Sequence, residues 1–521
     1  MRLIPAKLRF WLLMLGVVLT SLPAQAQDDE RAYNAAVYLL SQTMEPYRDG
    51  RHNALLLSLR HLQDPELSPL FDALIASPHA PQRVHGHLGS AEVSPNGHLD
   101  LVSVAEIEDT NEIVELLGAA IDSGVLAQAD LVQVLGWEGL DPASRQALAV
   151  HVVAGGGAID DAMLLESLIR DNDEPNTAQV LRHGLAALLL MQRGDTSASS
   201  ELEKLAVIGP DATRDPVRAQ LLEVALRHDF NAIGPWALAL AQDDAADGRL
   251  RLVALRTALR FLPATDRAPA AQWAAFFNET DDAAQRIRLA LVALEAAPYA
   301  TPDLYALLFD EADALFGLIA AAGRAIAADD REAEQSVTEL VAHGHPMALL
   351  WATRYAHDHA GESREAILLA VLSAFDQGPE RSRGRRAASA IDAVQALAEL
   401  ETSAAVEVLP ELLARAEPRP RGELTTAHII LLGLVRANGV DLFELARALP
   451  EPTDTDAKDL ALLLRARWAV PLDAAQWQRI SQIVAGQTSL DDSLRVQLAW
   501  LYLKHLGRTG EALRDVAAQT R

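Results

Sequence analysis

Cysteine is absent from the 521 residues of the chain. Its absence excludes disulfide bonds, thiolate metal sites and a thiol nucleophile. It also excludes a lipid-anchored form, which needs a cysteine at the signal cleavage site. Aromatic residues make up only 5% of the chain, so few side chains are present to form the aromatic platforms that usually hold sugars in carbohydrate enzymes. The fold must therefore gain its stability from packing alone.

Common catalytic signatures are missing as well. The chain contains no Gly-x-Ser-x-Gly turn, no Gly-Lys-Ser/Thr phosphate loop and no His-Glu-x-x-His pair. Two Asp-x-Asp stretches begin at Asp171 and Asp454, but Asn176 and Asp459 stand where a calcium loop needs a glycine. The sequence therefore predicts a protein that is not an enzyme and that needs no metal or other cofactor.

Positive charge is scarce. The chain has 45 basic residues against 72 acidic ones, which gives a net charge of −27. This balance argues against nucleic acid as a partner, because binding the phosphate backbone needs a basic surface. The partner that we expect is a protein or a peptide.

The chain has one long apolar run near its N-terminus. Basic residues at Arg2, Lys7 and Arg9 precede the apolar run Phe10–Leu19, and Ala24–Ala26 supplies a small-x-small cleavage site. Ten apolar residues are too few for a bilayer, which needs about 20. We therefore expect a cleavable signal peptide, a soluble protein in the periplasm or outside the cell, and no stable membrane insertion. An uncleaved membrane anchor is the alternative.

A repeated segment lies in the middle of the chain. Trp236 is followed 13 residues later by Arg249–Leu252, and Trp273 is followed 13 residues later by Arg286–Leu289. The two copies are offset by 37 residues. A constant period in the range of about 20–50 residues is the signature of a solenoid built from stacked repeats.

The helix expected after Trp236 has two apolar stripes. Leu252, Leu255 and Leu259 form one stripe, and another includes Leu250 and Val253. A surface helix needs only one apolar stripe, whereas a helix that packs on its own hairpin and on a neighbouring hairpin needs two. The pattern therefore predicts an all-α protein in which helix pairs stack on one another.

The repeated phrase resembles the HEAT repeat. An Asp-Pro pair, a short gap, an aliphatic-Arg pair and an alanine-rich helix recur, and Asp215–Ala219 matches best together with the two middle copies. Asp141-Pro142 opens a similar helix, while residues 501–513 look as much like a tetratricopeptide hairpin. The resemblance implies an open, right-handed α-solenoid of stacked antiparallel helix pairs, and it implies protein–protein binding.

Three segments follow from these patterns. We expect the signal peptide at residues 1–26, an N-terminal capping helix at 27–50 and the HEAT-like α-solenoid at 51–521, with roughly twelve helix pairs. Segments that interrupt the series of predicted helices are interpreted as ordinary loops, with hinges as the alternative. They lie at Gly155–Gly157, Asp171–Asn176 and Gly378–Arg386. A weak alternation at Leu99–Val104 leaves a short strand as a minor possibility.

Two clusters of arginines stand out in so acidic a chain. Equivalent loops of successive repeats emerge on the same edge of a solenoid, so these clusters are predicted to form one cationic edge that binds phosphate, carboxylate or an acidic peptide. The alternative is that they are solvated residues that neutralise neighbouring glutamates. The members of this edge are Arg381, Arg383, Arg385, Arg386, Arg415, Arg419 and Arg421.

Histidine pairs are the remaining candidates for chemistry. Residues two apart on a helix point about 200° away from each other, so such a pair shares a metal only where the backbone is extended. We therefore expect no metal site, and we interpret these histidines as helix-end residues near the backbone carbonyls. The pairs are His85 with His87, His343 with His345, and His357 with His359.

Two functions are compatible with this sequence. The first is an exported, non-catalytic scaffold that binds a protein or peptide, which the repeats and the missing catalytic motifs favour. The alternative is an α/α-toroid enzyme, a lyase or glycosidase that acts on polysaccharide. A toroid closes head to tail whereas a solenoid stays open, so the positions of the two chain ends discriminate between them.

Overall fold

The structure is a computed structural model of the chain, and all its regular elements in the described residues are helices. The predicted all-α class is thereby confirmed, and no strand occurs in this part of the chain. None of the described helices combines the length and the apolar character that crossing a bilayer requires. The described residues are 28–46, 50–138, 140–168, 176–207, 211–377, 383–400, 402–417, 424–438 and 441–519. The predicted signal peptide, at 1–26, lies outside them.

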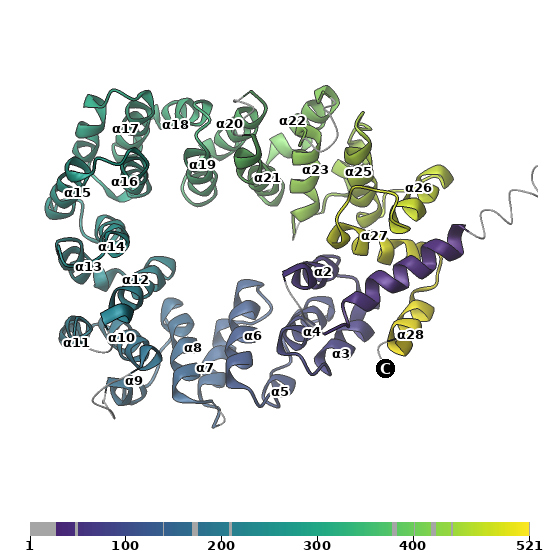
Figure 1. Cartoon of the computed structure of the whole chain (residues 1–521), viewed down its shortest axis with the longest axis horizontal. Coiled ribbons are helices and arrows are strands. Elements are labelled where there is room, and N and C mark those ends of the chain that lie inside the picture. Colours follow the sequence, from purple (N-terminus) through teal and green to yellow (C-terminus); the bar gives the residue numbers. More distant parts are fainter. Residues whose placement is uncertain are drawn as a thin grey trace, which may run out of the picture. The chain divides into compact units, whose positions relative to one another are not determined.

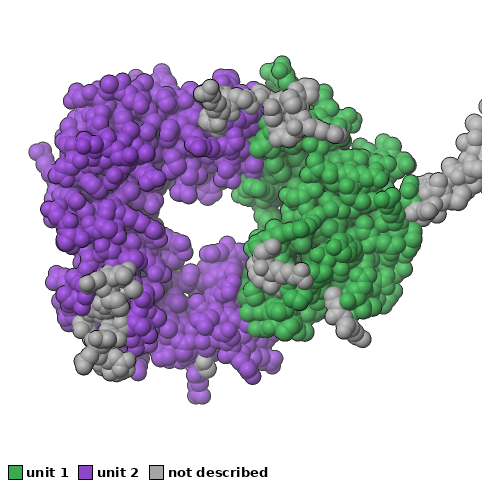
Figure 2. Space-filling view, in the orientation of Figure 1, with its two compact units in different colours: residues 1–99, 394–521 green, residues 100–393 purple. Residues whose placement is uncertain are grey.

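The chain divides into two compact units (Figure 2). Unit 1 combines residues 1–99 with residues 394–521, and unit 2 contains residues 100–393. Neither boundary falls at Gly155–Gly157, which is an ordinary loop after a helix inside unit 2. The break at Asp171–Asn176 lies almost wholly outside the described residues.

The helices of unit 1 come from both ends of the sequence. They are a helix at 28–42, α2 (Gly50–Arg60), α3 (Ser68–Ile75), α4 (Ala80–Val93), α22 (Ser403–Arg415), α23 (Thr426–Arg436), α24 (Phe443–Ala448), α25 (Thr455–Arg467), α26 (Ala474–Val484), α27 (Asp492–His505) and α28 (Thr509–Gln519). A short 3-10 helix at Pro65–Leu67 precedes α3.

Unit 2 is a succession of helices from one continuous segment. They are α5 (Leu101–Val104), α6 (Thr110–Asp122), α7 (Gln128–Leu135), α8 (Pro142–Ala154), α9 (Asp161–Leu168), α10 (Thr177–Gln192), α11 (Ser199–Lys204), α12 (Asp211–Arg227), α13 (Gly234–Ala241), α14 (Gly248–Phe261), α15 (Ala268–Glu279), α16 (Ala283–Glu295), α17 (Ala314–Ala327), α18 (Ala333–Ala342), α19 (Pro346–Asp358) and α20 (Arg364–Gln377). Five short 3-10 helices lie between them, at Thr196–Ala198, Asn231–Ile233, Ala297–Tyr299, Pro302–Asp310 and Gly361–Ser363. The helix α21 (Arg383–Glu399) spans the unit boundary.

Aspartate caps explain where many helices begin, and they account for part of the acidity of the chain. A carboxylate at the N-cap accepts backbone N–H groups that have no partner within the helix, and it also interacts favourably with the helix dipole. Aspartates that cap in this way include Asp100, Asp109, Asp141, Asp247, Asp282, Asp313, Asp454, Asp473 and Asp491.

The repeated segment forms two successive hairpins, α13 with α14 and α15 with α16. Trp236 and Trp273 lie on the first helix of each hairpin and are 7% and 0% exposed. The Trp273 Nε1–H donates to the carbonyl of Leu289 on α16 at 2.9 Å. Trp273 therefore joins the two helices of its hairpin.

Arginines at the start of each second helix contact the following hairpin. The Arg251 guanidinium lies 4.7 Å from the ring centre of Phe276 on α15. Arg286 lies over Phe277 and Phe316, at 4.4 and 5.9 Å from their ring centres. The aliphatic-Arg pair therefore contacts the next repeat in both copies, through its second arginine in the first copy and its first arginine in the second.

The helices of unit 2 alternate between two layers. In the second-helix layer, each of α8, α10, α12, α14, α16 and α19 packs on the next, and α11, α13 and α15 pack likewise in the first-helix layer. In Figure 1 the second-helix layer lies on the inner side of the curve that this unit makes. Packing of every helix on its pair and on its neighbour is what the two apolar stripes require.

The two ends of the chain pack on each other inside unit 1. Helix α2 packs on α27, and the Tyr33 hydroxyl of the helix at 28–42 donates to Asp515 of α28 at 2.7 Å. Tyr502 donates to Asp29 at 2.8 Å. The expected open array did not include these contacts, which join helices from the N-terminal and C-terminal parts of the sequence within unit 1. Local sequence patterns cannot predict a contact between residues more than 470 positions apart.

Three local expectations also change. Residues 101–104 form the helix α5, capped by Asp100, and not a strand. Asp215-Pro216 does not open a helix, because α12 begins at Asp211 and includes Pro216. The end of the expected loop Gly378–Arg386 is helical from Arg383 onward.

Histidines near the contact of the chain ends predict acid sensitivity of unit 1. Burial and the charges of Arg467, Arg60 and Arg436 lower the pKa of His61 to about 4. Burial, with Arg60 and a neighbouring histidine, also lowers the pKa of His85 to about 4. Both titrate near 6.5 when unfolded. Their stabilisation is therefore complete above about pH 6.5 and is lost as the pH falls toward 4, by up to about 3 kcal/mol for each residue.

Urea unfolding measured across this pH range tests the prediction. We expect the free energy of unfolding to fall between pH 7 and pH 5, and to fall less in a variant with His61→Gln and His85→Gln. The slope with pH is the readout, because the substitutions themselves can change stability at every pH. An equal slope in the variant would show that other groups cause the acid sensitivity.

Candidate functional site

The structure corrects the cationic edge at two of its arginines. Arg383 and Arg386 lie on α21 and are only 5% and 0% exposed. The Arg383 guanidinium lies 4.2 Å from the ring centre of Phe375 and 3.7 Å from Asp376. An Arg386 Nη2–H donates to the Phe375 carbonyl at 3.4 Å. These side chains hold α21 against α20, so they are not part of an exposed binding edge.

The other members of the predicted edge lie in three places. Arg385 is exposed on α21 and belongs to unit 2. Arg415 is exposed on α22, in unit 1, where it pairs with Glu411 one helical turn earlier at 3.1 Å. Arg381, Arg419 and Arg421 lie outside the described residues. An exposed edge made by the remaining arginines stays a prediction.

A pocket that sequence reasoning missed lies at the C-terminal ends of α14, α16 and α19. These three helices are neighbours in the second-helix layer of unit 2. The pocket has a volume of about 590 Å³, including space open to solvent. We call it the arginine–aromatic pocket. It is lined by Arg256, Arg260, Glu295, Ala296, Pro298, Trp351, Arg354, Tyr355, Asp358 and His359.

Aromatic rings form one side of the pocket. Trp351 and Tyr355, one turn apart on α19, stack with ring centres 5.1 Å apart and an angle of 14° between their planes. His359 follows at the end of the same helix and lies 6.1 Å from Tyr299, edge to face. Trp351 is 7% exposed, so the stack is fixed by the core and presents a preformed surface.

Most charged groups of the pocket already have partners. Arg256 Nε lies 2.5 Å from Glu295 Oε2, as an ion pair without hydrogen-bond geometry. Arg260 pairs with Asp229 and lies over the Tyr299 ring at 5.5 Å. Arg260 is in the last turn of α14, where the helix dipole favours a cation.

Two further groups bear on possible acid–base chemistry. Burial and the charge of Asp329 raise the pKa of Tyr355. A raised pKa keeps the phenol protonated at neutral pH, so it is not ready to act as a base. Asp358 Oδ1 lies 2.9 Å from Nδ1 of its neighbour His357.

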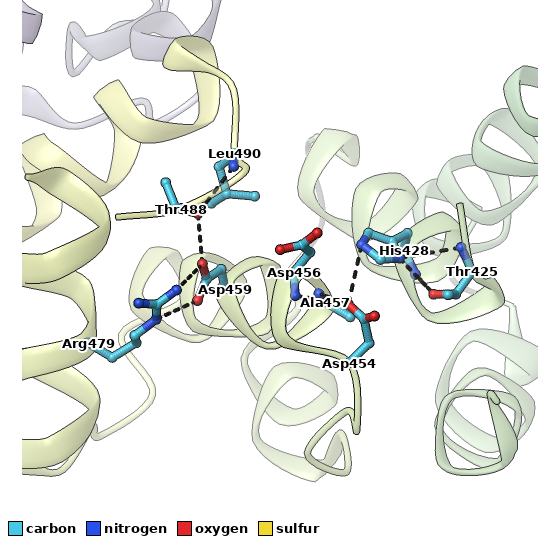
Figure 3. Close-up of polar contacts among 9 residues, drawn as sticks. All are labelled: Thr425, His428, Asp454, Asp456, Ala457, Asp459, Arg479, Thr488 and Leu490. Carbon is cyan, nitrogen blue, oxygen red and sulfur yellow. Dashed lines mark hydrogen bonds and ion pairs between the residues drawn. The ribbon is translucent and has the colours of Figure 1, made fainter. Parts of the chain in front are cut away.

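A second cluster, in unit 1, has the donor types of a metal site (Figure 3). One ligand atom from each of His428, Asp454 and Asp456 lies within 4.8 Å of the others. Asp454 caps α25 by accepting the N–H groups of Asp456 and Ala457, and it lies 3.7 Å from His428 Nε2. Asp456 is in the first turn of α25, where a carboxylate is favoured. Helix capping accounts for Asp454 and the first-turn position accounts for Asp456, so the cluster supports no metal proposal.

Asp459, one turn further along α25, has a structural role (Figure 3). It is 1% exposed and binds both Arg479 Nε, at 2.9 Å, and Arg479 Nη2, at 2.7 Å. The Thr488 hydroxyl donates to the same carboxylate at 2.7 Å. This buried ion pair ties α25 to α26 and to the loop that follows.

Comparison of the chain with family models, with curated proteins and with solved structures finds no match in any of the three. The architecture of the described residues is all-helical and repeat-like, with helices packed in pairs.

Proposed function

We propose that this protein is an exported, non-catalytic scaffold of HEAT-like helix pairs that binds a protein or peptide partner. The partner binds at the arginine–aromatic pocket, where three helices of the second-helix layer end. A stack of helix pairs offers a long continuous surface, and successive repeats place equivalent side chains next to one another along it. The pocket joins charged and apolar groups from three helices that are neighbours in the second-helix layer, which suits an extended ligand.

The proposal rests mainly on one observation: the acid–base groups of the pocket already make ion pairs or have a raised pKa. Glu295 is paired with Arg256 and Asp358 with His357, while burial raises the pKa of Tyr355. General acid–base catalysis is most effective when the pKa of such a group lies close to the working pH, and the raised pKa of Tyr355 lies further from it. Paired charges beside a preformed aromatic wall support binding better than turnover.

One observation favours the second candidate, the α/α-toroid enzyme that acts on polysaccharide. The chain ends pack on each other in unit 1, as they do in a toroid. Aromatic side chains together with arginines also suit an acidic sugar. This candidate requires two carboxylates that act as general acid and general base.

A paired assay separates the two candidates. The purified protein is incubated with anionic and neutral polysaccharides, and new reducing ends are measured. In parallel, binding to an immobilised peptide library is recorded. We expect saturable peptide binding without release of reducing ends. Turnover of a polysaccharide that Tyr355→Phe or Glu295→Gln abolishes would establish the enzyme instead.

A further inference from the structure

Arg354 differs from the other two arginines of the pocket. Arg256 pairs with Glu295, and Arg260 pairs with Asp229. Arg354 is exposed and makes no ion pair or hydrogen bond with any residue that the structure describes. It also precedes the last turn of α19, so the dipole of that helix does not explain its position. Its guanidinium group is free to bind a ligand.

The wall beside Arg354 is apolar. Trp351 and Tyr355 stack there, and Ala296 and Pro298 continue the lining from the end of α16. A flat or branched apolar side chain packs well on such a surface, because the stacked rings are already fixed and lose little freedom on binding.

The ion pairs of the pocket favour a ligand with a single negative charge. Arg256 pairs with Glu295 and Arg260 with Asp229, which leaves the Arg354 guanidinium without a carboxylate partner among the described residues. A phosphate carries close to two negative charges and needs more than one unpaired cation. A carboxylate carries one charge, and the planar fork of a guanidinium group binds both of its oxygens.

We propose that the arginine–aromatic pocket binds a carboxylate that a peptide presents next to an apolar side chain. Arg354 binds the carboxylate, and the stack of Trp351 and Tyr355 holds the apolar group. The carboxylate is either the C-terminus of the peptide or the side chain of an aspartate or glutamate, which share this chemistry. The inference rests on the proposed function, because it specifies the peptide segment that the scaffold binds.

Three fluorescein-labelled Gly-Ser peptides that end in phenylalanine test the inference. The first has a free C-terminal carboxylate, the second a C-terminal amide, and the third an amide with a glutamate before the phenylalanine. Dissociation constants are measured by fluorescence anisotropy. Wild type is expected to bind the first or the third peptide about tenfold more tightly than the second. One charge-assisted hydrogen bond contributes a difference in affinity of about that size. The tighter of the two identifies the source of the carboxylate.

Variants of the chain test whether Arg354 causes this preference. Arg354→Gln is expected to lose the tenfold preference while still binding the amide, and Arg354→Lys to retain part of it, because lysine keeps the charge without the fork. Arg331→Gln is the matched control, since Arg331 is exposed in unit 2 outside the pocket. It is expected to bind like wild type. Circular dichroism verifies that each variant is folded.

Different results would contradict the carboxylate proposal and the scaffold function. Equal binding of all three peptides by wild type, or equal effects of Arg354→Gln and Arg331→Gln, would overturn the carboxylate proposal and leave the scaffold function standing. Binding of none of the peptides would also overturn it. If an acidic oligosaccharide such as oligogalacturonate bound in their place and was cleaved, the scaffold function would fail as well.

Discussion

Trp273→Ala is expected to reduce the free energy of unfolding of the α15–α16 hairpin by about 3–5 kcal/mol. The Trp273 side chain is fully buried and stacks on Phe277 with ring centres 5.2 Å apart. Its indole N–H also binds the Leu289 carbonyl. Removing the ring leaves a cavity between the helices of the pair, which the rigid neighbouring pairs cannot fill.

Hydrogen exchange of the amides in α15 and α16 measures this effect, because repeat arrays open locally as well as globally. Trp273→Phe is the matched control. It keeps an aromatic ring and loses the N–H donor, so we expect a smaller loss of about 1–2 kcal/mol. Faster exchange that is confined to helices far from this hairpin, or no change at all, would contradict the role given to the tryptophan.

Asp64→Ala is expected to destabilise unit 1 by about 2–4 kcal/mol. Asp64 is 8% exposed, and it accepts hydrogen bonds from Trp500 Nε1 at 3.0 Å and Lys504 Nζ at 2.7 Å. Burial alone would raise the pKa of Asp64, but these hydrogen bonds outweigh it and hold the pKa below its usual value. Alanine leaves the buried indole N–H without a partner. Lys504 is 45% exposed and is hydrated instead, which limits the loss.

Chemical denaturation followed by circular dichroism gives the size of the effect, and exchange in α2 and α27 gives its location. Glu66→Ala is the control, because Glu66 is 49% exposed and lies 3.5 Å from the same lysine. Its loss is expected to be below about 0.5 kcal/mol. If the two variants lost equal stability, the buried carboxylate would not be what joins the chain ends.

The sequence predicted those parts of the fold that local patterns determine. The recurrence of Trp236 and Trp273 placed two hairpins correctly, because a buried tryptophan and two apolar stripes are requirements of one hairpin and its neighbour. Leu289, at the end of the second copy of the repeated phrase, is 0% exposed. Asp141-Pro142 was also interpreted correctly, since the aspartate caps α8 and the proline occupies its first position, where no N–H is needed.

The remaining features depend on contacts between residues far apart in the chain. The arginine–aromatic pocket draws Arg256, Glu295 and Trp351 from three different hairpins, and no one of them has a distinctive neighbourhood in the sequence. The exposure of arginines was also misjudged. Arg383 and Arg386 occur in a polar run, yet cation–aromatic and carbonyl contacts made it favourable to bury them.

Site-specific photo-crosslinking tests the central claim that a partner binds at the arginine–aromatic pocket. A benzoylphenylalanine replaces His359, which lines the pocket and is exposed, or Asn278, which is exposed on α15 in the first-helix layer. Irradiation of cells that produce the protein is expected to give a discrete adduct from position 359 alone, and Arg354→Gln is expected to abolish it. Adducts of equal yield from position 278, or an adduct from position 359 that Arg354→Gln leaves unchanged, would contradict the account.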